Sequence, residues 1–236
     1  QRFNDTIKNL TIYSEKKDKL ETIKDYLKTE NSADELLIFD LNNLVRMPKE
    51  LMGITCMTTN EKGKMVDIYY RQEEAPDFMD YYMSTEQDKK MDVEAMMKQL
   101  KSIQLDEITI KRLEKKYGSV YWYDWCNDNW GTKWNAWCLK VKEEEIISKN
   151  TEQDNLFMLI YEIETAWSPP FGCMPNFFKY VEDKNCTAKW ICEPDLNFNS
   201  EAKDSLTVRS YREAAVFAKD FLSMQKALRD SLRGDL

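Results

Sequence analysis

The N-terminal part of the chain opens with two apolar runs on either side of an amphipathic stretch. Residues 9–13 (NLTIY) combine β-branched and aromatic residues, which predicts a short strand. Residues 16–28 repeat apolar side chains at helical spacing, namely Leu20, Ile23 and Leu27. Residues 36–39 (LLIF) predict a second strand. We therefore expect a β-α-β part at residues 1–55.

The central part, residues 56–118, is predicted to be a mostly helical insertion. A polar, glycine-containing turn is expected at residues 58–64 (TTNEKGK). Residues 91–116 then carry apolar side chains at the three- and four-residue spacing of helices. Gly118 is placed to end the last helical stretch, because glycine readily adopts the left-handed conformation of a helix C-terminus.

The last part, residues 119–236, mixes helices with strands. In chain order the patterns predict a helix at 124–129, strands at 132–141 and 156–167, a helix at 175–181, a strand at 188–192 and a long C-terminal helix at 210–232. This α-β-β-α-β order is typical of an α+β protein with a ferredoxin-like antiparallel sheet covered by helices. The three parts are expected to form one compact domain.

The two longest predicted strands allow an expectation about side-chain faces. Strict alternation places Trp137, Leu139 and Val141 on one face of the first strand, with Ala136, Cys138 and Lys140 on the other. If the second strand pairs with it antiparallel, Glu162 and Glu164 lie across from Lys140 and Lys142. The two glutamates are therefore interpreted as part of a solvated, salt-bridged face rather than as an acid–base pair or a metal site.

The charge balance limits the partners. The chain of 236 residues has 42 acidic and 34 basic residues, a net charge of −8 and a pI near 4.9. An acidic surface does not favour direct binding to a phosphate backbone or to an anionic membrane surface. No apolar run reaches the roughly 18 residues of a membrane span. We expect a cytoplasmic protein, in a bacterial host cell, with no membrane partner.

The residues available for chemistry are also limited. The chain has no histidine, which excludes Ser-His-Asp and Cys-His mechanisms. Its six cysteines form no C-x-x-C pair and several lie in apolar runs, so buried thiols are favoured over disulfides or a metal site. We predict no catalytic residues, no metal and no cofactor. A binding protein is favoured over an enzyme, and both remain open.

Tryptophan is concentrated in one short string. Residues 121–137 (YWYDWCNDNWGTKWNAW) hold five of the seven tryptophans, and a second unusual string follows at residues 164–170 (ETAWSPP). One interpretation is a structural corner in which the rings pack helix, strand and proline loop together. The other is a binding site, because aromatic walls with a few polar groups are typical of ligand pockets. The candidate binding residues are Trp125, Trp130, Lys133, Trp134, Asn135, Trp167, Pro169 and Pro170.

These strings carry a resemblance to a known family. Residues 130–136 (WGTKWNA), followed one hairpin later by residues 165–170 (TAWSPP), resemble the YubB-type ferredoxin-like domain. Residues 42–52 (NNLVRMPKELM) are similar to a short Asn- and Pro-containing segment of that family, and residues 9–13 fit its opening strand. The resemblance implies a ferredoxin-like fold and an origin in phages or conjugative plasmids. The family's function is uncharacterised, and the resemblance supplies no catalytic residues.

Three hypotheses follow for the function. The leading one is a non-enzymatic phage or mobile-element protein that binds and inhibits a host protein, such as an anti-phage or CRISPR immune component. The alternative is a ligand-binding or enzymatic domain with a pocket at the corner formed by Trp130, Trp134 and Trp167. The second alternative is a plasmid or phage protein associated with single-stranded nucleic acid.

Overall fold

A computed structural model describes residues 5–30, 36–72, 102–149, 152, 154–192 and 205–232. The chain divides into two compact units. The first unit comprises Gln1–Arg46 and Cys126–Asp230, and the second comprises Met47–Trp125 and Ser231–Leu236. Both contain helices and antiparallel strands, so the expected α+β class is confirmed.

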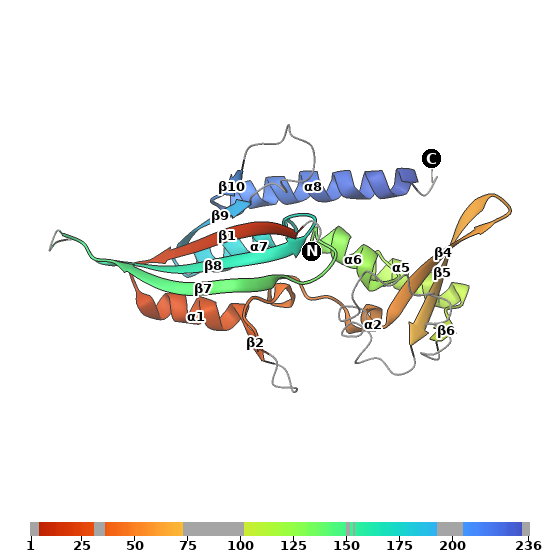
Figure 1. Cartoon of the computed structure of the whole chain (residues 1–236), viewed down its shortest axis with the longest axis horizontal. Coiled ribbons are helices and arrows are strands. Elements are labelled where there is room, and N and C mark those ends of the chain that lie inside the picture. The colour runs from red at the N-terminus through yellow and green to blue at the C-terminus, as the bar shows by residue number, and fades with distance from the viewer. Residues whose placement is uncertain are drawn as a thin grey trace. The chain divides into compact units, whose positions relative to one another are not determined.

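The first unit is built on a five-stranded antiparallel sheet (Figure 1). Its strands are β1 (Asp5–Ser14), β7 (Trp137–Ile146), β8 (Leu156–Ala166), β9 (Thr187–Cys192) and β10 (Leu206–Val208). They lie in the order β10-β9-β1-β8-β7, so the first strand pairs with both β8 and β9. Because β1 is central, the sheet joins segments from the two ends of the chain.

Two helices cover one face of this sheet. Helix α1 (Lys17–Leu27) contacts β1 and β8, and helix α7 (Met174–Asp183) contacts β9. In Figure 1, α7 lies behind the strands and α1 below them. The strands bury alternate side chains beneath the helices, namely Leu10, Ile12, Leu159, Tyr161, Ile163 and Trp190. This alternation follows from the two-residue period of a strand.

Aromatic rings fill the centre of the first unit. Phe39 makes edge contacts with Tyr161 and Trp190, at centroid distances of 5.3 and 6.0 Å. Phe177 of α7 makes a similar contact with Trp190 at 5.2 Å. Edge-to-face packing suits the positive rim and negative face of aromatic rings. The residue predicted to lie in a strand, Phe39, therefore serves as a core residue between sheet and helices.

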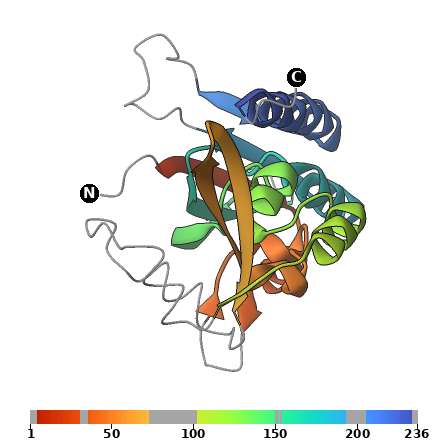
Figure 2. The same ribbon diagram turned by 90° about the vertical axis from the view of Figure 1, so that its right-hand side faces the viewer.

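The long C-terminal helix is confirmed as α8 (Tyr211–Leu232). Figure 2 shows it close to end-on, next to β10. It buries Ala214 and Ala218, and its Phe221 ring lies 4.7 Å from that of Phe171. Two of its apolar side chains, Tyr211 and Leu228, are exposed.

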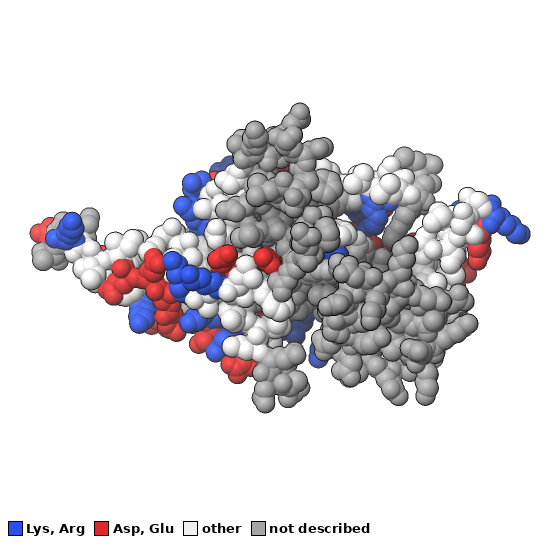
Figure 3. Space-filling view, viewed as in Figure 1, with Lys and Arg blue, Asp and Glu red and all other residues white. Residues whose placement is uncertain are grey.

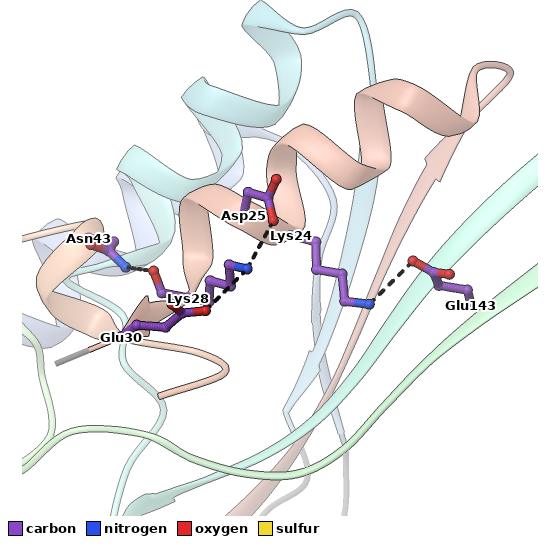
Figure 4. Close-up of polar contacts among 6 residues, drawn as sticks. All are labelled: Lys24, Asp25, Lys28, Glu30, Asn43 and Glu143. Atoms are coloured by element: carbon purple, nitrogen blue, oxygen red, sulfur yellow. Dashed lines mark hydrogen bonds and ion pairs between the residues drawn. The ribbon is translucent and has the colours of Figure 1, made fainter. Parts of the chain in front are cut away.

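A group of polar contacts lies at the C-terminal end of α1 (Figure 4). Lys28 forms ion pairs with Asp25 at 3.3 Å and with Glu30 at 3.6 Å. Lys24 reaches across to Glu143 of β7 at 3.4 Å, and the Asn43 amide donates to the Lys28 carbonyl at 3.1 Å. Exposed pairs of this kind contribute little to stability, and among these contacts Lys24–Glu143 is the one that links α1 to β7.

A β-bulge changes the faces expected along β7. The register shifts between Cys138 and Lys140, so Trp137 pairs with Glu164 and Lys140 with Glu162. The alternation predicted through Leu139 is therefore wrong, because one extra residue in a bulge reverses the faces beyond it. The expected Lys140–Glu162 pair is confirmed, whereas Lys142 lies opposite Ile160. Lys142 forms an ion pair with Glu144. Figure 3 shows charges of both signs interspersed over the described surface.

The segment between α1 and the second unit contains little regular structure. Strand β2 (Thr29–Glu30) pairs with β3 (Leu36–Leu37), and neither joins the five-stranded sheet. A short 3-10 helix, η1 (Leu41–Asn43), follows. Asp40 begins it, with its carboxylate accepting from the Asn42 backbone N–H at 2.9 Å. The run at residues 36–39 therefore contributes only two residues of strand.

The second unit has its own three-stranded sheet. Its elements are α2 (Lys49–Met52), β4 (Ile54–Glu61), β5 (Lys64–Gln72), β6 (Ser102–Gln104) and α5 (Glu107–Tyr117). The polar turn expected at residues 58–64 is the end of the β4–β5 hairpin, where Lys62 and Gly63 have positive φ. Residues 73–101 lie outside the described part of the chain, so most of the predicted helical stretch before α5 does too. The described part of residues 56–118 comprises strands as well as the helix α5.

Helix α5 is attached to α2 through one carboxylate. Glu50 accepts hydrogen bonds from Arg112 and from the Tyr117 hydroxyl, each at 2.7 Å. These two donors lower the pKa of Glu50 to about 2. The helix ends at Gly118 (φ +73°), whose N–H donates to the Glu114 carbonyl, as the sequence predicts.

Candidate binding surface

The turn after β8 holds a tryptophan in a rare conformation. Trp167 has φ +65°, which is a steric outlier for a bulky side chain. Its neighbours fix this turn by hydrogen bonds. The Ala166 carbonyl accepts from the Ser168 N–H and from the Thr132 hydroxyl, each at 2.8 Å, and the Thr165 hydroxyl donates to the Ser168 carbonyl at 2.6 Å. The backbone strain at Trp167 is therefore maintained by the surrounding structure.

Two glycines bring the tryptophan strings together. Gly131 has φ +82°, and a side chain there would lie 3.3 Å from the Phe171 nitrogen. A side chain at Gly172 would overlap the carbonyl of Asn129. Two hydrogen bonds join the strings where their backbones approach closely. The Gly172 N–H donates to the Trp130 carbonyl at 3.0 Å, and the Ser168 hydroxyl donates to the Gly131 carbonyl. The strings at 130–136 and 165–170 therefore form one corner.

On the outer side of this corner a lysine lies between two tryptophans. The Lys133 Nζ is 3.9 Å from the ring centroid of Trp134 and 3.9 Å from that of Trp167. Lys133 and Trp134 are half-buried, whereas Trp167 is 54% exposed. An ammonium at this distance from a ring face is attracted by the ring quadrupole. We call these three residues, Trp134, Lys133 and Trp167, the tryptophan clamp.

The inner side of the corner contains residues with structural contacts. Trp130 is 2% exposed, and its indole N–H donates to the Val45 carbonyl at 2.7 Å. The Asn135 side chain accepts from the Leu41 N–H at 2.9 Å and donates to the Asp40 carboxylate at 2.8 Å. Both residues therefore hold the segment around η1 in place.

The remaining sequence-predicted site residues do not join the clamp in a common group. Pro170 is buried, and Pro169 is half-buried with its carbonyl accepting from Phe171 at 2.8 Å. Trp125 is buried in the second unit, where its backbone N–H donates to the Tyr121 carbonyl. The eight candidates are therefore divided between a packed interior and a surface.

Sequence reasoning did not select Thr165 and Ser168, although both fix the turn that presents Trp167. The available signal was a pair of hydroxyl residues flanking a tryptophan just before two prolines, because such residues satisfy turn backbone groups. Trp137 was also not selected as a site residue, and it is 60% exposed on β7.

The cysteines are thiols rather than disulfides, as expected. Of the six, Cys126, Cys173, Cys186 and Cys192 are buried. Burial raises the pKa of the Cys126 and Cys173 thiols, which disfavours the reactive thiolate. Within the described ranges, no group of three His, Cys, Asp or Glu side chains is placed to hold a metal ion. No helix among the same residues is long and apolar enough to cross a membrane.

The chain matches no protein-family model, no curated protein and no solved structure. The resemblance to the YubB-type domain therefore stays a prediction that rests on the two tryptophan strings.

Proposed function

We propose that this chain is a non-enzymatic binding protein that docks onto another protein through the surface around Trp167. The observation that carries the proposal is the conformation of this residue. Trp167 is more than half exposed while its backbone is held at positive φ. A left-handed conformation costs a residue with a side chain roughly 1–2 kcal/mol, and strain of this kind concentrates where it serves a function.

Interface physics supports the same assignment. Tryptophan is enriched among the few residues that carry most of the binding energy of protein interfaces. A ring that is already fixed in its binding position loses little conformational freedom when the complex forms. Trp167 meets this requirement because Thr132, Thr165 and Ser168 hold its turn.

The geometry favours a docking surface over a ligand pocket at the same corner. The inner ring, Trp130, is packed and its polar group is already used. Between the outer rings, the space is taken by the ammonium of Lys133. The exposed face of Trp167, by contrast, can be approached directly by a partner protein.

We further propose a ferredoxin-like arrangement for the first unit and, with it, a mobile-element origin. The chain order β1-α1-β7-β8-α7-β9 has the β-α-β-β-α-β pattern of that fold. The strands that are neighbours in the sheet, β9 with β1, β1 with β8 and β8 with β7, are all antiparallel. On this proposal the partner is a host protein, such as an immune component, and docking inhibits it. Backbone NOEs between Leu10 and Trp190 test the pairing of β1 with β9, and their absence from an assigned NMR spectrum would refute it.

A tagged pull-down from nuclease-treated bacterial lysate tests the function. We expect the wild-type chain to retain one protein in stoichiometric amount, and Trp167→Ala to lose it while keeping its fold. Tyr211→Ala is the matched control, because Tyr211 is an exposed aromatic residue on α8. Equal retention by Trp167→Ala and wild type, or retention that nuclease treatment abolishes, would contradict the proposal.

A further inference from the structure

The tryptophan clamp contains a cation of its own. The Lys133 ammonium is equally distant from the Trp134 and Trp167 ring centroids, at 3.9 Å. Two ring faces around one ammonium form the kind of aromatic site that recognises lysine, arginine and quaternary ammonium groups. Lys133 therefore shows which chemistry this site accepts.

We propose that the clamp is a cation-binding site that Lys133 occupies in the isolated chain and that a basic side chain of the partner occupies in the complex. This inference rests on the proposed docking function and names the chemistry of the partner at that surface. Lys133 acts as a stand-in that keeps the site filled until the partner arrives.

Each of the two ring contacts that place the Lys133 ammonium in the clamp is weak. A cation–π contact at an exposed site changes an equilibrium by less than about tenfold, and Trp167 is more than half exposed. The lysine is also long and flexible, so its ammonium can move into water without a change in the backbone. A partner's arginine offers a larger planar cation, which stacks on aromatic faces and is more weakly hydrated than an ammonium.

The charge of the chain favours a basic partner. Its net charge is −8, so a positively charged protein is attracted during approach. Displaced from the rings, the Lys133 ammonium remains at the surface, where water solvates it.

Tetramethylammonium is the probe that tests the site, using the whole chain with ¹⁵N-labelled tryptophan. Lys133→Ala empties the clamp and leaves both rings. We expect the indole signals of Trp134 and Trp167 to report tetramethylammonium binding about tenfold tighter in this variant than in wild type. The exposed Trp137 indole is the internal control for weak binding to any exposed ring. Neutral tert-butanol, of similar size, should show no gain.

Three outcomes would overturn the inference: equal affinity in wild type and Lys133→Ala, an equal gain for tert-butanol, or an equal response of Trp137. Lys133→Gln is the second variant, which removes the charge but keeps more of the side chain, should the alanine variant fail to fold. Its expected result is the same gain for tetramethylammonium over tert-butanol.

Binding of the partner that the pull-down identifies can be measured for both variants, and this distinguishes the cation site from the docking function. If a partner cation replaces Lys133, Lys133→Ala should bind the partner up to about tenfold more tightly. Weaker binding would mean that Lys133 itself contacts the partner or positions Trp167. If Trp167→Ala loses the partner while the emptied clamp takes no cation, the docking function stands and the cation site does not.

Discussion

The inner and outer sides of the tryptophan corner use the same residue types for different purposes. On the inner side, Trp130 is buried and hydrogen-bonded, and Asn135 satisfies both Leu41 and Asp40. On the outer side, Trp167 is exposed, strained and in contact with a cation. The difference teaches that a shared sequence string does not imply a shared role, and three measurements can sharpen or break this contrast.

The largest effect is expected from Trp130→Ala. Removing a buried tryptophan costs about 3–5 kcal/mol, and the Val45 carbonyl also loses its donor. Urea unfolding should show this loss in the free energy of unfolding, whereas Trp167→Ala should stay within about 1 kcal/mol of wild type. Equal losses for the two variants would end the distinction between inner and outer sides.

Asn135→Ala should have the second largest effect. It leaves the Leu41 N–H and part of the Asp40 carboxylate without their partner, and an unsatisfied buried group costs about 1–3 kcal/mol. A double-mutant cycle with Asp40→Ala isolates the pair. A coupling energy near zero would show that the two side chains act independently.

Trp167→Gly should leave stability within about 1 kcal/mol of wild type, because glycine adopts positive φ without steric cost. The contact with Lys133 is lost, which offsets part of the gain. The matched control is Trp137→Gly, which places glycine at the first residue of β7 and should lower the free energy of unfolding by up to about 1 kcal/mol. A stability loss at Trp167 as large as that of Trp130→Ala would show that the outer ring is structural.

The smallest effect concerns pH and the second unit. Glu50 has its pKa lowered from 4.5 to about 2 by Arg112 and Tyr117. A depressed carboxylate pKa stabilises the fold above the unfolded value, and this contribution is lost as the pH falls from 4.5 towards 2. The protection of the α5 amides, corrected for the intrinsic pH dependence of exchange, should therefore fall over this window in wild type. Glu50→Gln should remove this pH dependence, and an unchanged profile in the variant would contradict the role of Glu50.

Much of the fold could be predicted from local patterns. The helix α1, the strand β8 and the helix α8 follow from apolar spacing alone. The Gly118 end of α5 follows from the conformational freedom of glycine. The bulge at Cys138 and Lys140 could not be predicted, because it depends on how β7 pairs with β8 and leaves no mark in the alternation of this strand.

The candidate site was predictable only as a region. The sequence by itself determined that tryptophans, a lysine and a proline pair gather in two strings, since side-chain type and spacing are local properties. Only the tertiary structure decided which rings face inward and which outward. It did so through contacts between residues far apart in the chain, namely Thr132 with Ala166, Trp130 with Val45 and Lys133 with Trp167. Such contacts form only when β8 returns beside the Gly131 turn, so no local pattern can encode them separately.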